Sequence, residues 1–228
     1  GLFKTGTGAM ILNAASTFAG PMQIIAGNVT MSGVAGSLVN SPSLTLNNLI
    51  TFTFNDVTEN FAGSGARLQK IISTGANITL QGNGGGTTEQ LNTLTLAGGS
   101  TTVGILPASG TTAGLRLTNT SNGLDVPGSA NRSTVLFRGN SLGSGAADAA
   151  SLFIDVGITD QLVGGGGAPG STSVDILPYA IGDSTNTGVG MSFVTYDPTY
   201  GIRPLDTIVE FIDYAAASNV DNVIISAD

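Results

Sequence analysis

Short runs in which apolar residues alternate with polar ones recur along the chain, and they most constrain its fold. The runs lie at Leu44 to Leu46, Ile50 to Phe54, Ile78 to Leu80, Leu94 to Leu96, Leu115 to Leu117 and Val135 to Phe137. A period of two buries one side of a β-strand and leaves the other side in water. Clusters of Gly, Pro, Asn and Ser separate the runs and permit sharp turns. The pattern predicts an all-β chain of short strands.

The spacing of the runs separates two all-β architectures. Leu80, Leu96, Leu117 and Phe137 follow one another at intervals of 16, 21 and 20 residues, close to the roughly 20 to 25 residues of one β-solenoid coil. A β-sandwich would show turns about every 8 to 12 residues and a heavier aromatic core. The spacing favours the solenoid without excluding the sandwich. We expect about ten coils of about 22 residues.

Helical signals are few. Residues 67–72 and 146–153 contain helix formers and predict at most a turn or two each. In the tail from residue 206 to 228 we expect strand at both ends, and the pattern leaves its middle undetermined.

Composition excludes several function classes. The net charge is −8 and the seven basic residues are scattered, so no basic stripe is present for nucleic acid. The chain has no Cys and no His, which removes thiolate catalysis, zinc-thiolate sites and the usual general base.

No apolar run reaches the roughly 18 to 20 residues that a membrane helix needs, so no membrane insertion is expected. Because the chain begins at Gly1, we interpret it as a mature or excised piece.

The first thirty residues resemble a known repeat. The stretch LFKTGTGAMILNAASTFAGPMQIIAGNVTM closely resembles the autotransporter-associated β-strand repeat of bacterial surface proteins. The matching positions are Lys4, Gly6, Gly8, Leu12, Phe18, Gly20, Ile24, Gly27 and Val29. Residues 87–103, 135–145 and 218–228 look like segments that accompany this repeat.

The resemblance implies a right-handed parallel β-helix that is exported to the bacterial surface or beyond. It also implies a structural or adhesive role rather than an enzymatic one. We therefore expect one β-helix domain over 1–228, with 1–31 as its first coil. A Gly- and Pro-rich loop insertion at 163–205 and a closing segment at 206–228 would form an irregular C-terminal region.

Oxygen-bearing side chains offer two kinds of candidate site. Carboxylates that could pair for glycan cleavage are Asp155 with Asp160, Asp175 with Asp183, and Asp206 with Glu210 and Asp213. Asp183, Asn186 and Asp197 could meet around calcium, although no calcium-loop motif is present. Solvated turn residues explain all of them more simply, so we expect no catalytic, cofactor or metal site. Calcium remains a weak alternative.

Aromatic residues gather near the end of the chain. Five of the nine Phe and four Tyr residues are Phe193, Tyr196, Tyr200, Phe211 and Tyr214. They could cap the last coil or form an interface, where Tyr and Phe are favoured. The candidate assembly interface adds residues near the two termini, namely Leu2, Phe3, Val223 and Ile225.

The leading functional hypothesis is an extracellular structural protein that assembles head to tail into a rod or filament. Its partners would be copies of itself or neighbouring repeats in a longer chain. The alternative is an adhesin that recognises a surface glycan or protein through 163–205. A polysaccharide-active enzyme ranks third, because Trp is absent and basic residues are few.

Overall fold

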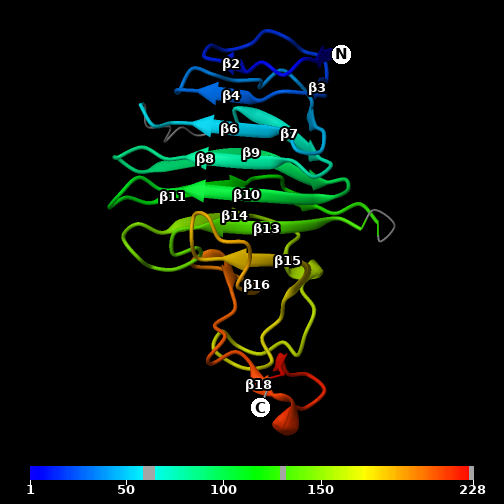
Figure 1. The fold of residues 1–228 in the computed structure, drawn as a ribbon, viewed down its shortest axis with the longest axis vertical. Coiled ribbons are helices and arrows are strands. Elements are labelled where there is room, and N and C mark those ends of the chain that lie inside the picture. The colour runs from blue at the N-terminus through cyan, green and yellow to red at the C-terminus, as the bar shows by residue number, and fades with distance from the viewer. Residues whose placement is uncertain (59–64, 129–131, 226–228) are drawn as a thin grey trace.

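The computed structural model describes residues 1–58, 65–128 and 132–225, and these residues are almost entirely β-strand and turn. The strands stack along the long axis of the molecule, with the two termini at opposite ends (Figure 1). The predicted all-β class is confirmed.

Two long sheets make up most of the molecule. The first contains β1 (Leu2–Lys4), β3 (Met22–Ile24), β5 (Leu44–Leu46), β7 (Leu68–Ser73), β9 (Thr87–Leu96), β11 (Ala113–Leu117) and β14 (Ala150–Ile154), with β12 (Leu124–Asp125) also beside β9. The second contains β2 (Met10–Leu12), β4 (Val29–Ser32), β6 (Thr51–Asn55), β8 (Asn77–Gln81), β10 (Ser100–Leu106), β13 (Thr134–Gly139), β15 (Leu177–Asp183), β16 (Ser192–Asp197) and β17 (Gly201–Pro204).

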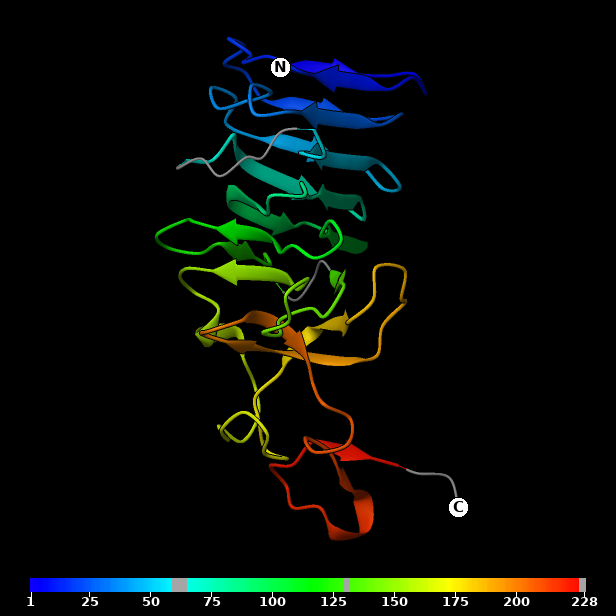
Figure 2. The ribbon, with the colours of Figure 1, turned by 90° about the vertical axis from the view of Figure 1, so that its left-hand side faces the viewer.

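Strand pairing is parallel from β1 to β15, and the strands apart from β12 pass alternately from one sheet to the other. We call one strand of the first sheet and the following strand of the second sheet a rung. Among the described strands of the two long sheets, pairing turns antiparallel at β15–β16 and β16–β17. A small parallel sheet of β18 (Ile212–Asp213) and β19 (Val223–Ile224) lies beyond (Figure 2). The 3-10 helices are η2 (Thr159–Gln161) and η3 (Tyr214–Ala216).

The core consists of apolar side chains stacked in register between the two sheets. Leu12, Met31, Phe54, Leu80 and Ile105 are successive partners in the second sheet. All except Leu12, which belongs to the first rung, are buried. Strands in a sheet lie about 4.8 Å apart, so each side chain contacts the equivalent one on the next rung. The predicted alternating runs are confirmed as strands. All have one buried side except Leu94–Leu96, where Thr95 is buried as well.

The predicted coil length agrees with the first rungs, whereas the predicted number of coils is wrong. In the first sheet Leu2 pairs with Met22 and Met22 with Leu44, which lie 20 and 22 residues further along the chain. Later rungs are longer, since Leu117 pairs with Ile154, 37 residues further on. Seven rungs, from β1–β2 to β14–β15, therefore form in place of about ten.

The segment boundaries also need correction. Residues 1–31 hold four strands and so span two rungs, because β1 pairs with β3 and β2 with β4. The segment 163–205 is not a loop insertion, since it contains β15, β16 and β17. Leu177 and Val194 from this segment are buried in the core.

The helical predictions at 67–72 and 146–153 are wrong. Leu68–Ser73 forms β7, and Ala150–Ile154 forms β14. Burial of alternate residues against the neighbouring rungs overrides the local helix propensity of both segments. In the tail, strand at 223 is confirmed, whereas residues 206–211 form turns and the first strand there begins at Ile212.

Candidate functional site

The first rung exposes one edge of each sheet. Within the described residues, β1 pairs only with β3, and β2 only with β4. Leu2 and Met10 direct their N–H groups toward these partners, each in a 2.9 Å bond. Because successive residues of a strand direct their backbone groups to opposite sides, those of Phe3 and Ile11 face outward. Their side chains are 62% and 64% exposed. We call β1, β2 and residues 5–9 the β1–β2 end.

Lys4 closes the corner of this rung. Its register partner is Ile24, so Lys4 stands in line with a buried row of the first sheet. The Nζ atom donates to Ala26 O at 2.7 Å and to Gly6 O at 3.0 Å. Gly27 has a φ of 80°, and a Cβ atom there would overlap Lys4 Nζ and the carbonyl oxygen of Gly8. The Lys and Gly positions of the repeat resemblance thus shape a corner of the stack.

The opposite end of the first sheet is covered. The hydroxyl of Tyr196 accepts from Ile154 N at 3.3 Å and donates to Ile154 O at 3.0 Å, so it occupies the outer edge of β14. Gly201 lies against the carbonyl of Leu152, where a Cβ atom would not fit. β17 ends at Pro204, which has no N–H to offer another strand. β16 and β17 therefore cap the stack.

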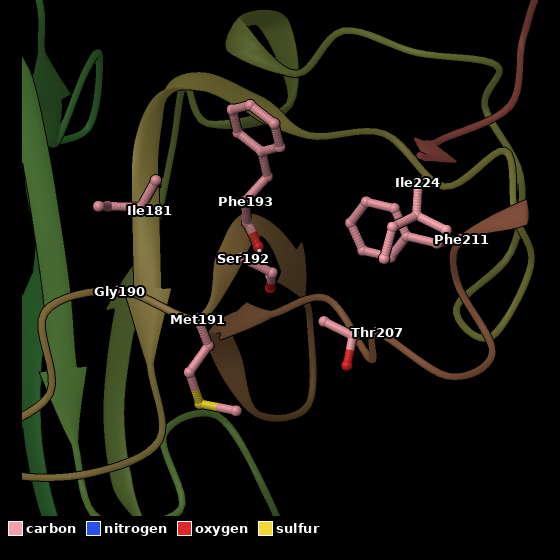
Figure 3. A pocket seen from close by; sticks show the side chains of 8 residues that line it. All are labelled: Ile181, Gly190, Met191, Ser192, Phe193, Thr207, Phe211 and Ile224. Carbon is pink, nitrogen blue, oxygen red and sulfur yellow. Dashed lines mark hydrogen bonds between the residues drawn. The ribbon is translucent and has the colours of Figure 1, made fainter. Parts of the chain in front are cut away.

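An apolar groove of about 320 Å³ lies beside this cap. Side chains from β15 and β16 line one side and those from 207–224 line the other (Figure 3). Met191 is 57% exposed, Phe193 43% and Ile224 44%. The groove is lined by Ile181, Gly190, Met191, Ser192, Phe193, Thr207, Phe211 and Ile224.

Glu210 joins the segments around the groove. Its carboxylate is buried and accepts from both terminal nitrogens of Arg203, at 2.7 and 2.6 Å. It also accepts from the backbone N–H groups of Gly170, at 2.7 Å, and Asp206, at 2.8 Å. Burial would raise the pKa of Glu210, but these hydrogen bonds outweigh it and hold the pKa at about 2. The carboxylate thus stays ionised and connects β17, the 163–175 segment and the tail.

Glu210→Gln should loosen the tail while leaving the rungs intact. The amide cannot accept all four hydrogen bonds, so we expect local opening to become easier by about 2 to 3 kcal/mol. Hydrogen exchange should accelerate in 206–225 and at Gly170, and not in β3 to β13. In the parent chain the carboxylate contribution is present above pH 4.5 and declines as the pH falls toward 2. Asp160→Asn, on the exposed face of η2, is the control. Unchanged hydrogen exchange in Glu210→Gln would contradict the role of Glu210 in connecting these segments.

The residues of the predicted assembly interface lie at both ends of the stack. Tyr196 belongs to the cap, and Tyr200 packs over Gly145. Leu2 and Phe3 lie at the β1–β2 end, and Phe193, Phe211, Tyr214, Val223 and Ile225 lie beyond the last rung with exposed or half-buried side chains. The aromatic cluster therefore supplies both a cap and an exposed surface.

The candidate carboxylate pairs are occupied in turns and ion pairs. Asp155 accepts from Arg116 Nε at 2.7 Å, and Asp175 accepts from the Gly166 N–H at 2.7 Å. Asp206 and Asp213 accept from backbone N–H groups two residues further on. These bonds shape the local backbone.

The candidate calcium ligands do not converge. Asp183 accepts from Thr185 and Gly190, whereas Asn186 accepts from the N–H of Asn140. Gly182 pairs with Ser192 in the antiparallel hairpin, so Asp183 and Asp197 lie near opposite ends of β16. No group of three or more acidic side chains that could hold a metal is found within residues 1–58, 65–128 and 132–225.

A buried charge cluster was not predicted. Arg67 Nη2 donates to Asp56 Oδ1 at 2.9 Å, and Arg67 also forms an ion pair with Glu89 through Oε1. The guanidinium donates further to the carbonyl oxygens of Gly33 and Gly36. All three charged side chains are at most 4% exposed. The alternation of Thr87, Glu89 and Leu91 places Glu89 on the buried side of β9, and that signal could have identified it.

Two carboxylates share this one cation. Desolvation raises the pKa of Glu89 to about 8, because the attraction of Arg67 compensates only in part. Desolvation likewise raises the pKa of Asp56, and a hydrogen bond with the Glu89 carboxyl group offsets this only in part. The cluster therefore holds a proton near neutral pH. It lies inside the stack, where Asp56 and Glu89 are fully buried.

No helix among the described residues is long and apolar enough to cross a membrane. Comparison with protein-family models, curated proteins and solved structures finds no match to this chain.

Proposed function

We propose that the chain is a unit of a right-handed parallel β-helix that serves as an extracellular rod on a bacterial surface. The observation that carries this proposal is the contrast between the two ends of the stack. Among the described residues, the β1–β2 end presents an unpaired edge of each long sheet, whereas the other end is capped by β16 and β17. Unpaired edges of this kind bind further strands.

The alternation of strands between two parallel sheets supports the β-helix. The repeat resemblance points to the same architecture, because Lys4 and Gly27 build the corner between β3 and β4 at positions that match the repeat. The resemblance also implies that the protein is exported and that its role is not enzymatic.

Side chains on the outer surface also suit a mechanical role. Gln23 Nε2 donates to Asn47 Oδ1 at 3.1 Å, and Thr118 donates to Asn92 at 2.9 Å. These bonds link successive rungs on the outside, while apolar rows link them inside. A rod with continuous backbone ladders and few charges resists proteases and bending. No cofactor is required for such a role.

Assembly of the purified 228-residue chain tests the proposal. We expect sedimentation velocity to show association that grows with concentration, and electron microscopy to show rods one molecule wide. Phe3→Pro removes the outward N–H of β1 without touching its bonds to β3, and should reduce association at least tenfold. Circular dichroism checks that the variant is folded. A parent chain that stays monomeric at every concentration would contradict the proposal.

A further inference from the structure

We propose that the apolar groove beside the cap receives the β1–β2 end of a second copy of this chain. This inference rests on the proposed rod function and names the surface through which rods join. The groove would then be one half of a heterologous, head-to-tail contact.

Large apolar side chains are exposed in the segments that supply the groove. Close in sequence to its lining residues, such side chains are exposed at Val189, Ile208, Val209, Tyr214, Val220, Val223 and Ile225. Single exposed apolar residues are ordinary, whereas many of them in segments that line an apolar groove favour a binding surface. The β18–β19 sheet has only two strands, and two strands alone are marginally stable in water. A partner that covers this surface would stabilise it.

The distribution of charged residues indicates which surface of a second copy fits the groove. After Arg203 the chain contains five acidic residues and no basic one, whereas residues 1–55 contain Lys4 and no acidic residue. Two grooves facing each other would bring their acidic surroundings together, which costs free energy. The β1–β2 end carries no opposing negative charge and presents Phe3 and Ile11 as exposed apolar side chains. It is therefore the surface of a second copy that fits the groove best.

The geometry also allows the contact to repeat. β2 and β18 lie toward opposite ends of the long axis (Figure 1), and the groove lies between β15–β16 and the segment that contains β18 and β19. A contact between the groove and the β1–β2 end leaves one free groove and one free β1–β2 end on every pair, so association continues in one direction. A contact between two grooves would stop at a dimer.

Two paired variants and their mixture test this inference. The end variant carries Phe3→Thr and Ile11→Thr, which keep the backbone N–H groups. The groove variant carries Met191→Ser and Ile224→Ser, both at exposed positions. Each variant alone should associate at least tenfold more weakly than the parent chain in sedimentation velocity. An equimolar mixture should form heterodimers that do not grow further, because the mixture retains one intact groove and one intact end per pair.

The control variant carries Val39→Ser and Val57→Ser, two exposed apolar positions away from both ends. It should associate like the parent chain, and all variants are checked by thermal melting. An end variant that still dimerises alone would show groove-to-groove contact and overturn the inference. A groove variant that assembles normally would also overturn it while leaving the rod function intact. A monomeric parent chain would instead remove the rod function itself.

Discussion

Arg67→Met is expected to destabilise the protein by about 3 to 5 kcal/mol, a large part of the 5 to 15 kcal/mol typical of a folded domain. The substitution keeps the length and most of the volume of the side chain. It removes the only cation that contacts Asp56 and Glu89 among the described residues. Urea unfolding at pH 7, followed by circular dichroism, measures the change as a lower midpoint.

The size of this effect follows from burial. Asp56 and Glu89 are fully buried, so water cannot replace the guanidinium. The carbonyl oxygens of Gly33 and Gly36 also lose their donor. Removing one partner of a buried ion pair lowers the free energy of unfolding by more than the intact pair contributes, because the other charge stays buried and uncompensated.

A matched control separates burial from charge. Arg116→Met removes an ion pair with Asp155 in which the Arg side chain is 53% exposed, and it should cost less than about 1 kcal/mol. Adding Asp56→Asn and Glu89→Gln to Arg67→Met should restore part of the lost stability. If Arg67→Met and Arg116→Met have equal effects, the buried cluster is not a stability determinant.

The strands were predictable because each has one buried side. Thr45 separates Leu44 from Leu46, and Thr53 separates Phe52 from Phe54. Such a period of two is expected of a half-buried strand in any sheet. The number of coils was not predictable from the same residues. Leu80 and Leu96 show the same alternating pattern, and no neighbouring residue indicates that they belong to different sheets.

The ends of the stack were predictable only in part. Composition located the aromatic cluster, but the role of Tyr196 depends on a hydrogen bond to Ile154, far away in sequence. Glu210 looked equivalent to Asp206 and Asp213 as an acidic residue. Its contacts with Arg203 and Gly170 arise only when separate segments meet. Long-range contacts of this kind leave no local signature.

The stability of the parent chain should fall as the pH rises from about 5 to 8. Glu89 has a pKa of about 8 in the folded protein and 4.5 when exposed. Between these values the folded state binds a proton that the unfolded state releases, so raising the pH favours unfolding. The stabilisation is complete below pH 4.5 and lost as the pH passes 8. At about 1.4 kcal/mol per pKa unit, the decline amounts to a few kcal/mol.

Glu89→Gln should remove this pH dependence, because the amide is neutral at every pH and keeps an oxygen that can accept from Arg67. The variant should unfold at nearly the same urea concentration at pH 5 and pH 8, and it should exceed the parent chain in stability at pH 8. Asp155→Asn, in the exposed pair with Arg116, should keep the parental slope. A Glu89→Gln variant with that same slope would show that the proton resides on another group, and Asp56→Asn would then identify it.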